Sequence, residues 1–148
     1  MKVEMPFAPI SKMETIAPHA RWMVVDDDDG VRGFLASVLQ MRGGAAIAQF
    51  RSAAEALAAF AAMPNQFQFV ITDLEMPGMN GIELCRRLHE LSPNLKVLLA
   101  TGNGTANEAG ARQSGFCGLL SKPFPASELW RTVEAAGVIP SVTTMATY

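Results

Sequence analysis

The sequence predicts an α/β protein in which strands and helices alternate along the chain. Short apolar runs of strand length recur at residues 21–25, 46–50, 69–72, 96–100 and 118–120. Between them lie segments with helical spacing of apolar residues or with capping residues at their start. Because a helix follows each strand, we expect a parallel sheet joined by right-handed crossovers.

The first half of the chain contains two strand–helix pairs. After the strand at 21–25, the helical segment has one apolar face, and Asp28 or Asp29 is expected to cap it. After the strand at 46–50, Ser52 and Glu55 form a capping box for a helix that ends near residue 62. The apolar face of the first helix consists of Val31, Leu35, Val38 and Leu39.

The central strand, residues 69–72, ends on Asp73 and is followed by strong turn residues. Asn80 and Glu83 predict the start of a helix that runs from about residue 81 to 91. Three leucines of this helix are expected to face the core: Leu84, Leu88 and Leu91.

The last two helices differ in strength. A helix at about 105–114 is predicted to be weak, because Gly110 lies inside it and its apolar side is mostly alanine. The final helix starts near Pro125 and has Leu129 and Val133 directed inward. Trp130, next to Leu129, is expected either to point partly outward, as part of a partner surface, or to be partly buried.

Length and composition indicate one cytoplasmic domain, residues 21–137, with a weakly ordered arm at 1–20 and a tail at 138–148. The net charge of −2 gives no reason to expect nucleic-acid binding. The apolar runs are too short to span a membrane, and residues 1–20 lack a secretory signal. Cys85 and Cys117 lack metal-ligand spacing and are interpreted as free thiols in a reducing compartment.

Polar residues follow four of the predicted strands. They are an acidic run beginning at Asp26 and Asp27, the single carboxylate of Asp73, the hydroxyl of Thr101, and the ammonium of Lys122. Ligands of open α/β sheets bind beyond the carboxyl ends of the strands, so these groups are expected to converge on one edge. Taken singly, each could be an ordinary turn or cap residue.

Together these motifs resemble the receiver domain of two-component response regulators, of the stand-alone chemotaxis type. The resemblance covers about residues 21–137 and implies a doubly wound (βα)5 fold with a five-stranded parallel sheet of order 2-1-3-4-5. The matching pieces are Val24-Val25-Asp26-Asp27, Asp73 with Met76-Pro77-Gly78-Met79-Asn80-Gly81, Thr101 after its strand, and Lys122-Pro123-Phe124.

The resemblance implies that Asp73 is the phosphoacceptor and that Mg²⁺ binds beside it. Asp27 and Asp73 would ligate the ion directly, the backbone carbonyl of Glu75 would give a third ligand, and Asp26 would act through water. The chemistry agrees, because two carboxylates near 4 Å repel by about 4 kcal/mol at an effective dielectric constant of 20, and a cation removes that cost.

Thr101 and Lys122 are the phosphate-contacting residues that the resemblance implies. A cis peptide bond before Pro123 would direct the Lys122 ammonium into the site. The family usually has an aromatic residue three places before this lysine, where the present sequence has Leu119. Coupling of Thr101 to an aromatic side chain is therefore not expected here, and Gly102 should leave access to the site open.

By resemblance, the chain takes a phosphoryl group from a histidine kinase or histidine phosphotransfer protein. It would then signal by protein contact through the face formed by the helix at 105–114, the strand at 118–120 and the last helix. We expect no output domain after residue 137, no binding to nucleic acid or membrane, a monomer or weak dimer, and no catalysis beyond its own phosphorylation and dephosphorylation.

Three alternatives are kept open. The chain could be a receiver cut from a hybrid histidine kinase, or a receiver that binds partners without phosphorylation. From another class, a Mg²⁺-dependent phosphohydrolase of the haloacid-dehalogenase kind also uses an aspartate nucleophile, and Asp26-Asp27-Asp28 supplies an Asp-x-Asp sequence. That family needs an acidic pair after the lysine, but only Glu128 and Glu134 follow Lys122, and Asp73 would have no role.

Overall fold

The computed structural model describes residues 21–43 and 45–138. The predicted arm at 1–20 and the predicted tail from residue 139 on lie outside these residues. Within these residues the structure contains five strands, five α-helices and one 3₁₀ helix. In chain order they are β1 (Arg21–Val25), α2 (Asp29–Gly43), β2 (Ala46–Phe50), α3 (Ala53–Ala62), η2 (Pro64–Gln66), β3 (Phe69–Thr72), α4 (Gly81–Leu91), β4 (Lys96–Thr101), α5 (Glu108–Gln113), β5 (Gly118–Ser121) and α6 (Ala126–Ala135).

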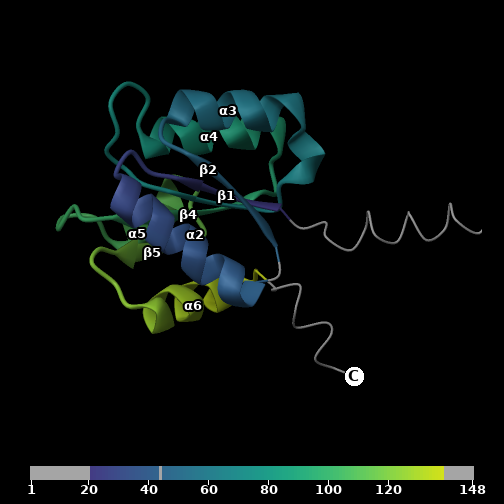
Figure 1. Ribbon diagram of the computed structural model, residues 1–148. Helices are drawn as coiled ribbons and strands as arrows, with labels where there is room; N and C mark the ends of the chain where they lie inside the picture. The colour runs from purple at the N-terminus through teal and green to yellow at the C-terminus, as the bar shows by residue number, and fades with distance from the viewer. Residues whose placement is uncertain (1–20, 44, 139–148) are drawn as a thin grey trace, which may run out of the picture.

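All strands are parallel and lie in the order β2-β1-β3-β4-β5, which confirms the predicted doubly wound sheet. Helices α3 and α4 cover one face of the sheet, and α2 and α6 cover the other (Figure 1). The chain reverses its winding direction between β1 and β3, so a crevice is expected beyond the carboxyl ends of these two strands.

Two apolar cores fill the space between the sheet and its helices. Residues alternate between them along each central strand: Met23 and Val25 of β1 lie in the core under α3 and α4, and Trp22 and Val24 lie in the core under α2 and α6. Because both faces are covered, the strands are apolar at nearly every position. This packing makes the sheet a rigid support for the residues that follow each strand.

Several local predictions hold. Ser52 and Asn80 cap α3 and α4 through bonds from the backbone N–H of Glu55 and Glu83, at 3.1 and 2.9 Å. Of the two candidate caps for α2, Asp28 makes the bond, because its Oδ1 accepts the N–H of Val31 at 3.0 Å.

Three predictions about burial or extent are wrong. Leu91 is exposed, because it lies in the last turn of α4, where Leu95 from the following turn fills the core instead. Helix α5 is shorter than predicted. The side-chain oxygen of Asn103 accepts the N–H of Thr105 in a turn, and the helix begins only at Glu108, after its cap Asn107. Of the two placements expected for Trp130, the outward one is wrong: the side chain is buried in the core under α2 and α6, and Arg42 of α2 stacks on its ring at 4.7 Å.

Candidate functional site

The sheet's backbone bonds continue past the ends of β1 and β3 and fix the first residue after each. The N–H of Asp26 donates to Phe50 at 3.1 Å, and the N–H of Asp73 donates to Val25 at 2.9 Å. Both aspartates are buried. Their side chains are therefore set by the rigid sheet rather than by a free loop.

The approach of α4 further fixes the backbone at Asp73. A Cβ at Gly81, the first residue of this helix, would lie 2.2 Å from the carbonyl oxygen of Asp73. Only glycine fits so close a contact. The N–H of Gly81 donates to the carbonyl of Leu74 at 2.8 Å, and the N–H of Leu74 donates to Oδ1 of Asp73 at 2.8 Å.

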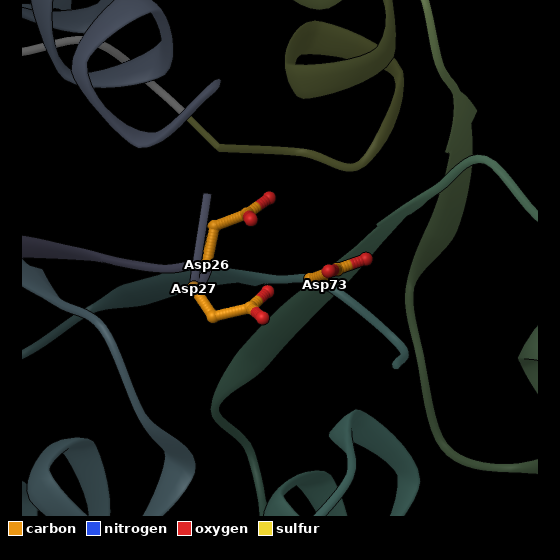
Figure 2. A group of neighbouring side chains, drawn as sticks. All are labelled: Asp26, Asp27 and Asp73. Carbon is orange, nitrogen blue, oxygen red and sulfur yellow. The ribbon is translucent and has the colours of Figure 1, made fainter. Parts of the chain in front are cut away.

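Asp26, Asp27 and Asp73 form one cluster at the carboxyl ends of β1 and β3. One carboxylate oxygen from each lies within 4.8 Å of the other two, and the three side chains are directed toward a common space (Figure 2). Asp27 is exposed, which leaves this space open to solvent. The structure thus brings together the three carboxylates that the sequence predicted.

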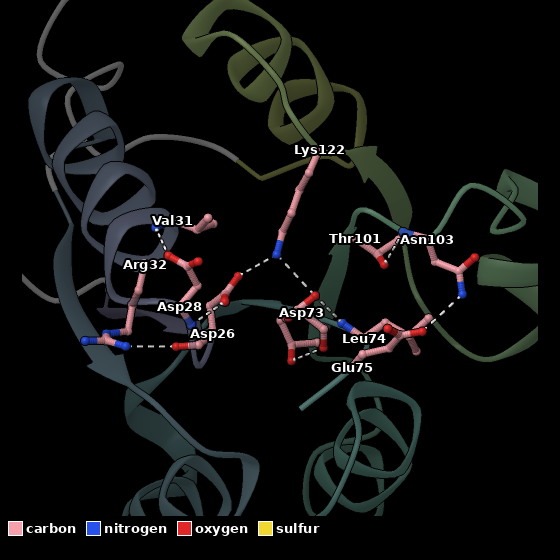
Figure 3. Close-up of polar contacts among 11 residues, drawn as sticks. Asp26, Asp28, Val31, Arg32, Asp73, Leu74, Glu75, Thr101, Asn103 and Lys122 are labelled. Carbon is pink, nitrogen blue, oxygen red and sulfur yellow. Dashed lines mark hydrogen bonds and ion pairs between the residues drawn. The ribbon is translucent and has the colours of Figure 1, made fainter. Parts of the chain in front are cut away.

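Lys122 reaches the same cluster from the end of β5. Its Nζ lies 2.8 Å from Oδ2 of Asp26 and 3.2 Å from Oδ1 of Asp73 (Figure 3). The Lys122–Pro123 peptide bond is cis. A cation between two carboxylates is well placed to pair with a third anionic group that enters the space.

The charges of the cluster shift the pKa values of its members in a consistent way. Burial and the charge of Asp26 raise the pKa of Asp73, and Lys122 offsets only part of this effect. Burial alone would lower the pKa of Lys122, but its hydrogen bond to Asp26 and the negative charge of both carboxylates raise it. The lysine therefore stays protonated, while the ionised form of Asp73 is left with too little positive charge around it.

Thr101 and Glu75 lie on the other side of the site. Thr101 is buried, and its hydroxyl oxygen accepts the N–H of Asn103 at 3.0 Å; no hydrogen bond joins it to Asp73 within the described residues. The Glu75 carboxylate turns toward Asn103, whose side-chain amide donates to it at 3.3 Å (Figure 3). The backbone carbonyl of Glu75 accepts no hydrogen bond from residues 21–43 or 45–138.

These donors fit magnesium. Three carboxylates and a carbonyl oxygen without a partner among the described residues are hard oxygen ligands, and the excess negative charge around Asp73 favours a divalent cation. The residues of the cluster are thus suited to hold Mg²⁺.

Sequence reasoning missed three parts of the site. Arg32 of α2 donates to the carbonyl oxygen of Asp26, and its spacing of three from Asp29 was the available signal. Asn103 links Thr101 to Glu75, although only its turn propensity marked it. An apolar depression of about 240 Å³ adjoins Lys122, and its walls come from segments that are far apart in the sequence: Gly30, Val31, Phe34, Lys122, Pro123 and Phe124.

Comparison with known proteins gives a consistent answer. The profile of the response regulator receiver domain matches residues 22–134. The C4-dicarboxylate transport transcriptional regulatory protein DctD of Rhizobium meliloti is 36% identical over 114 residues, which are 76% of this chain and 24% of DctD. The response regulator receiver protein CpdR of Brucella abortus is 33% identical over 115 residues, which are 77% of this chain and 93% of CpdR.

A crystal structure of a receiver domain protein from Clostridium thermocellum superposes with a TM-score of 0.71 at 28% identity, covering 79% of this chain and 93% of that one. The chain belongs to the response regulator receiver domain family, and it is a signalling domain of two-component phosphorelays. It spans about a quarter of the length of DctD. Among the described residues, no helix is long and apolar enough to cross a bilayer.

Proposed function

We propose that Asp73 accepts a phosphoryl group from a phosphohistidine, with Mg²⁺ held by Asp27, Asp73 and the carbonyl of Glu75, and by Asp26 through water. The observation that carries the proposal is the convergence of three carboxylates and one ammonium at the end of the sheet. The ion would neutralise the carboxylates and the incoming phosphoryl oxygens.

The residues of the chain then supply positioning and charge. A carboxylate oxygen of Asp73 attacks phosphorus, the phosphorus–nitrogen bond breaks, and its electron pair leaves with the imidazole of the donor. Lys122, which bridges Asp26 and Asp73 at 2.8 and 3.2 Å, is placed to pair with the transferred oxygens. Its raised pKa keeps it cationic throughout.

Thr101 is proposed to transmit the effect of phosphorylation from Asp73 to the surface of the domain. Its hydroxyl is held by the N–H of Asn103, whose side chain also bonds Glu75 and Thr105. A shift of the hydroxyl toward a phosphoryl group on Asp73 would disturb this set of bonds and move the loop that leads into α5. The α5–β5–α6 face would then be the surface for a downstream protein.

The donor is proposed to be a histidine kinase or a histidine phosphotransfer protein. The apolar depression beside Lys122 supports a protein donor, because a protein has apolar side chains that can pack into it and a small phosphodonor does not. Phe34 at its edge is 42% exposed, and Phe124 lies 6.0 Å from it between ring centroids. The free thiols of Cys85 and Cys117 agree with action in a reducing cytoplasm.

The test is the stoichiometry of phosphorylation. With acetyl phosphate and Mg²⁺, intact mass should show one added phosphoryl group per chain, and none should appear when EDTA removes the metal. Steady hydrolysis of p-nitrophenyl phosphate, with turnover far above one, would favour the phosphohydrolase alternative and contradict the proposal.

A further inference from the structure

The loop of consecutive aspartates after β1 must be held so that two of them face Asp73. Asp26 is fixed through its own side chain, since Oδ1 accepts the N–H of Asp28 at 2.9 Å and Oδ2 pairs with Lys122. The Asp27 carboxylate makes no hydrogen bond or ion pair with residues 21–43 or 45–138. Its direction therefore depends on the backbone that carries it.

Arg32, in the first turn of α2, holds that backbone. Its Nη1 donates to the carbonyl oxygen of Asp26 at 2.9 Å, and its Nη2 donates to Oδ1 of Asp29 at 2.6 Å. The bond to the Asp26 carbonyl is visible in Figure 3. This carbonyl belongs to the planar peptide that joins Asp26 to Asp27, so the bond fixes the plane from which Asp27 projects.

The burial of Arg32 separates it from an ordinary surface partner of acidic residues. Its side chain is only 14% exposed, although the carboxylate of Asp29 that it binds is 73% exposed. Arg51 also approaches Asp29, at 3.6 Å, but its side chain is 65% exposed and it makes no bond to the Asp26 carbonyl. The two arginines carry the same charge near the same loop, but of the two only Arg32 donates a hydrogen bond to the backbone of that loop.

We propose that Arg32 is a positioning residue for the magnesium site: by fixing the 26–27 peptide, it aims the Asp27 carboxylate at the space in front of Asp73. The inference rests on the proposed function, because it assumes that Asp27 and Asp73 hold the ion. It requires the planar guanidinium, whose two donors reach a carbonyl and a carboxylate at once. A lysine at this place keeps the charge but is a single point donor.

Charge and position predict opposite effects on metal affinity. If Arg32 acted only through its positive charge, its removal would strengthen the attraction of the acidic cluster for a cation. If it positions Asp27, its removal weakens binding, and loss of a residue that supports a metal ligand typically costs about 10-fold to 100-fold in affinity.

The test is a MgCl₂ titration of the full chain, followed by the amide NMR signals of residues 26–29. In Arg32→Ala we expect the Mg²⁺ dissociation constant to rise by about tenfold. Arg32→Lys should also bind more weakly than wild type. Arg51→Ala, the charge-matched control, should bind as tightly as wild type or slightly more tightly. If Arg32→Ala does not give a folded spectrum, Arg32→Lys alone decides the question.

The outcomes distinguish a failure of the positioning role of Arg32 from a failure of the proposed function. Binding by wild type, together with unchanged or tighter binding in both Arg32 variants, would overturn the positioning role and leave the proposed function intact. Wild-type affinity in Arg32→Lys would also overturn it, since a single point donor would then suffice and the two donors of the guanidinium would not be required. Failure of the wild type to bind Mg²⁺ would contradict the proposed function and, with it, this inference.

Discussion

Replacing Asp73 by asparagine should stabilise the metal-free protein at neutral pH, although it removes a partner of Lys122. The ionised carboxylate of Asp73 lies within 4.8 Å of the carboxylates of Asp26 and Asp27, which repel it. Against this repulsion stands the attraction of one ammonium, Nζ of Lys122, at 3.2 Å. Asparagine keeps an oxygen that can accept the N–H of Leu74, so the local backbone contact is retained.

The magnitude follows from these distances. At an effective dielectric constant of about 20, the ammonium attracts the carboxylate by about 5 kcal/mol, and each of the two carboxylates repels it by about 3.5 kcal/mol or more. Repulsion therefore exceeds attraction by about 2 kcal/mol, which destabilises the ionised form of Asp73. This net cost falls to roughly 1 kcal/mol when solvent screening at this half-open site is included. For a domain of this size, that corresponds to a rise in melting temperature of roughly 4 °C.

The pH dependence has a definite sign. The folded state raises the pKa of Asp73 above its unfolded value, so the folded state holds a proton more tightly. The cost is therefore absent below the unfolded pKa of about 4 and appears as the pH rises through the raised folded value. Asp73→Asn should gain stability over wild type at pH 7 and lose that advantage near pH 4.

Thermal melts in EDTA at both pH values provide the assay, with Asp29→Asn as the matched control. The hydrogen bond and charge of Arg32 lower the pKa of Asp29, so the same substitution there should lower the melting temperature at pH 7. Adding Mg²⁺ should stabilise the wild type by mass action and have little effect on Asp73→Asn. A melting temperature of Asp73→Asn at or below that of wild type at pH 7 would refute the charge argument.

Three further predictions concern other parts of the molecule. Phe34→Ala should slow phosphoryl transfer from a phosphohistidine protein but not from acetyl phosphate; equal slowing with both would exclude a docking role. In iodoacetamide at pH 8, Cys85 should react more slowly than Cys117, because its burial in the core raises the pKa of its thiol to about 12; equal rates should appear only in urea. Beryllofluoride with Mg²⁺ should change hydrogen exchange most within residues 102–115, and unchanged protection there with the mimic bound would exclude α5 from the output.

The sequence could predict the strands and the ends of the sheet because these depend on local signals. The apolar runs, the caps at Ser52 and Asn80, and the turn after Asp73 each have a short-range cause. Once parallel strands are inferred, their polar ends must meet at one edge. This is why the cluster of Asp26, Asp27 and Asp73 could be predicted before any coordinates.

The remainder depends on which helix lies beside which, and that information is non-local. Trp130 has the spacing of a half-exposed residue on α6, but it joins the core under α2 and α6, and Arg42 of α2 stacks on its ring. Leu91 has the spacing of a core residue but lies in the last turn of its helix, where Leu95 fills the core. The hydrogen bond from Arg32 to the Asp26 carbonyl could not be predicted, because no sequence pattern encodes the direction of that carbonyl.

The most direct test of the central claim is to locate the phosphoryl group. After acetyl phosphate and Mg²⁺, borohydride reduction converts an aspartyl phosphate to homoserine, which peptide mass spectrometry can place. We predict one homoserine, at residue 73, in wild type and in Asp29→Asn, and none in Asp73→Asn. Homoserine at residue 26 or 27, or equal labelling of Asp73→Asn, would contradict the assignment of Asp73 as the phosphoacceptor.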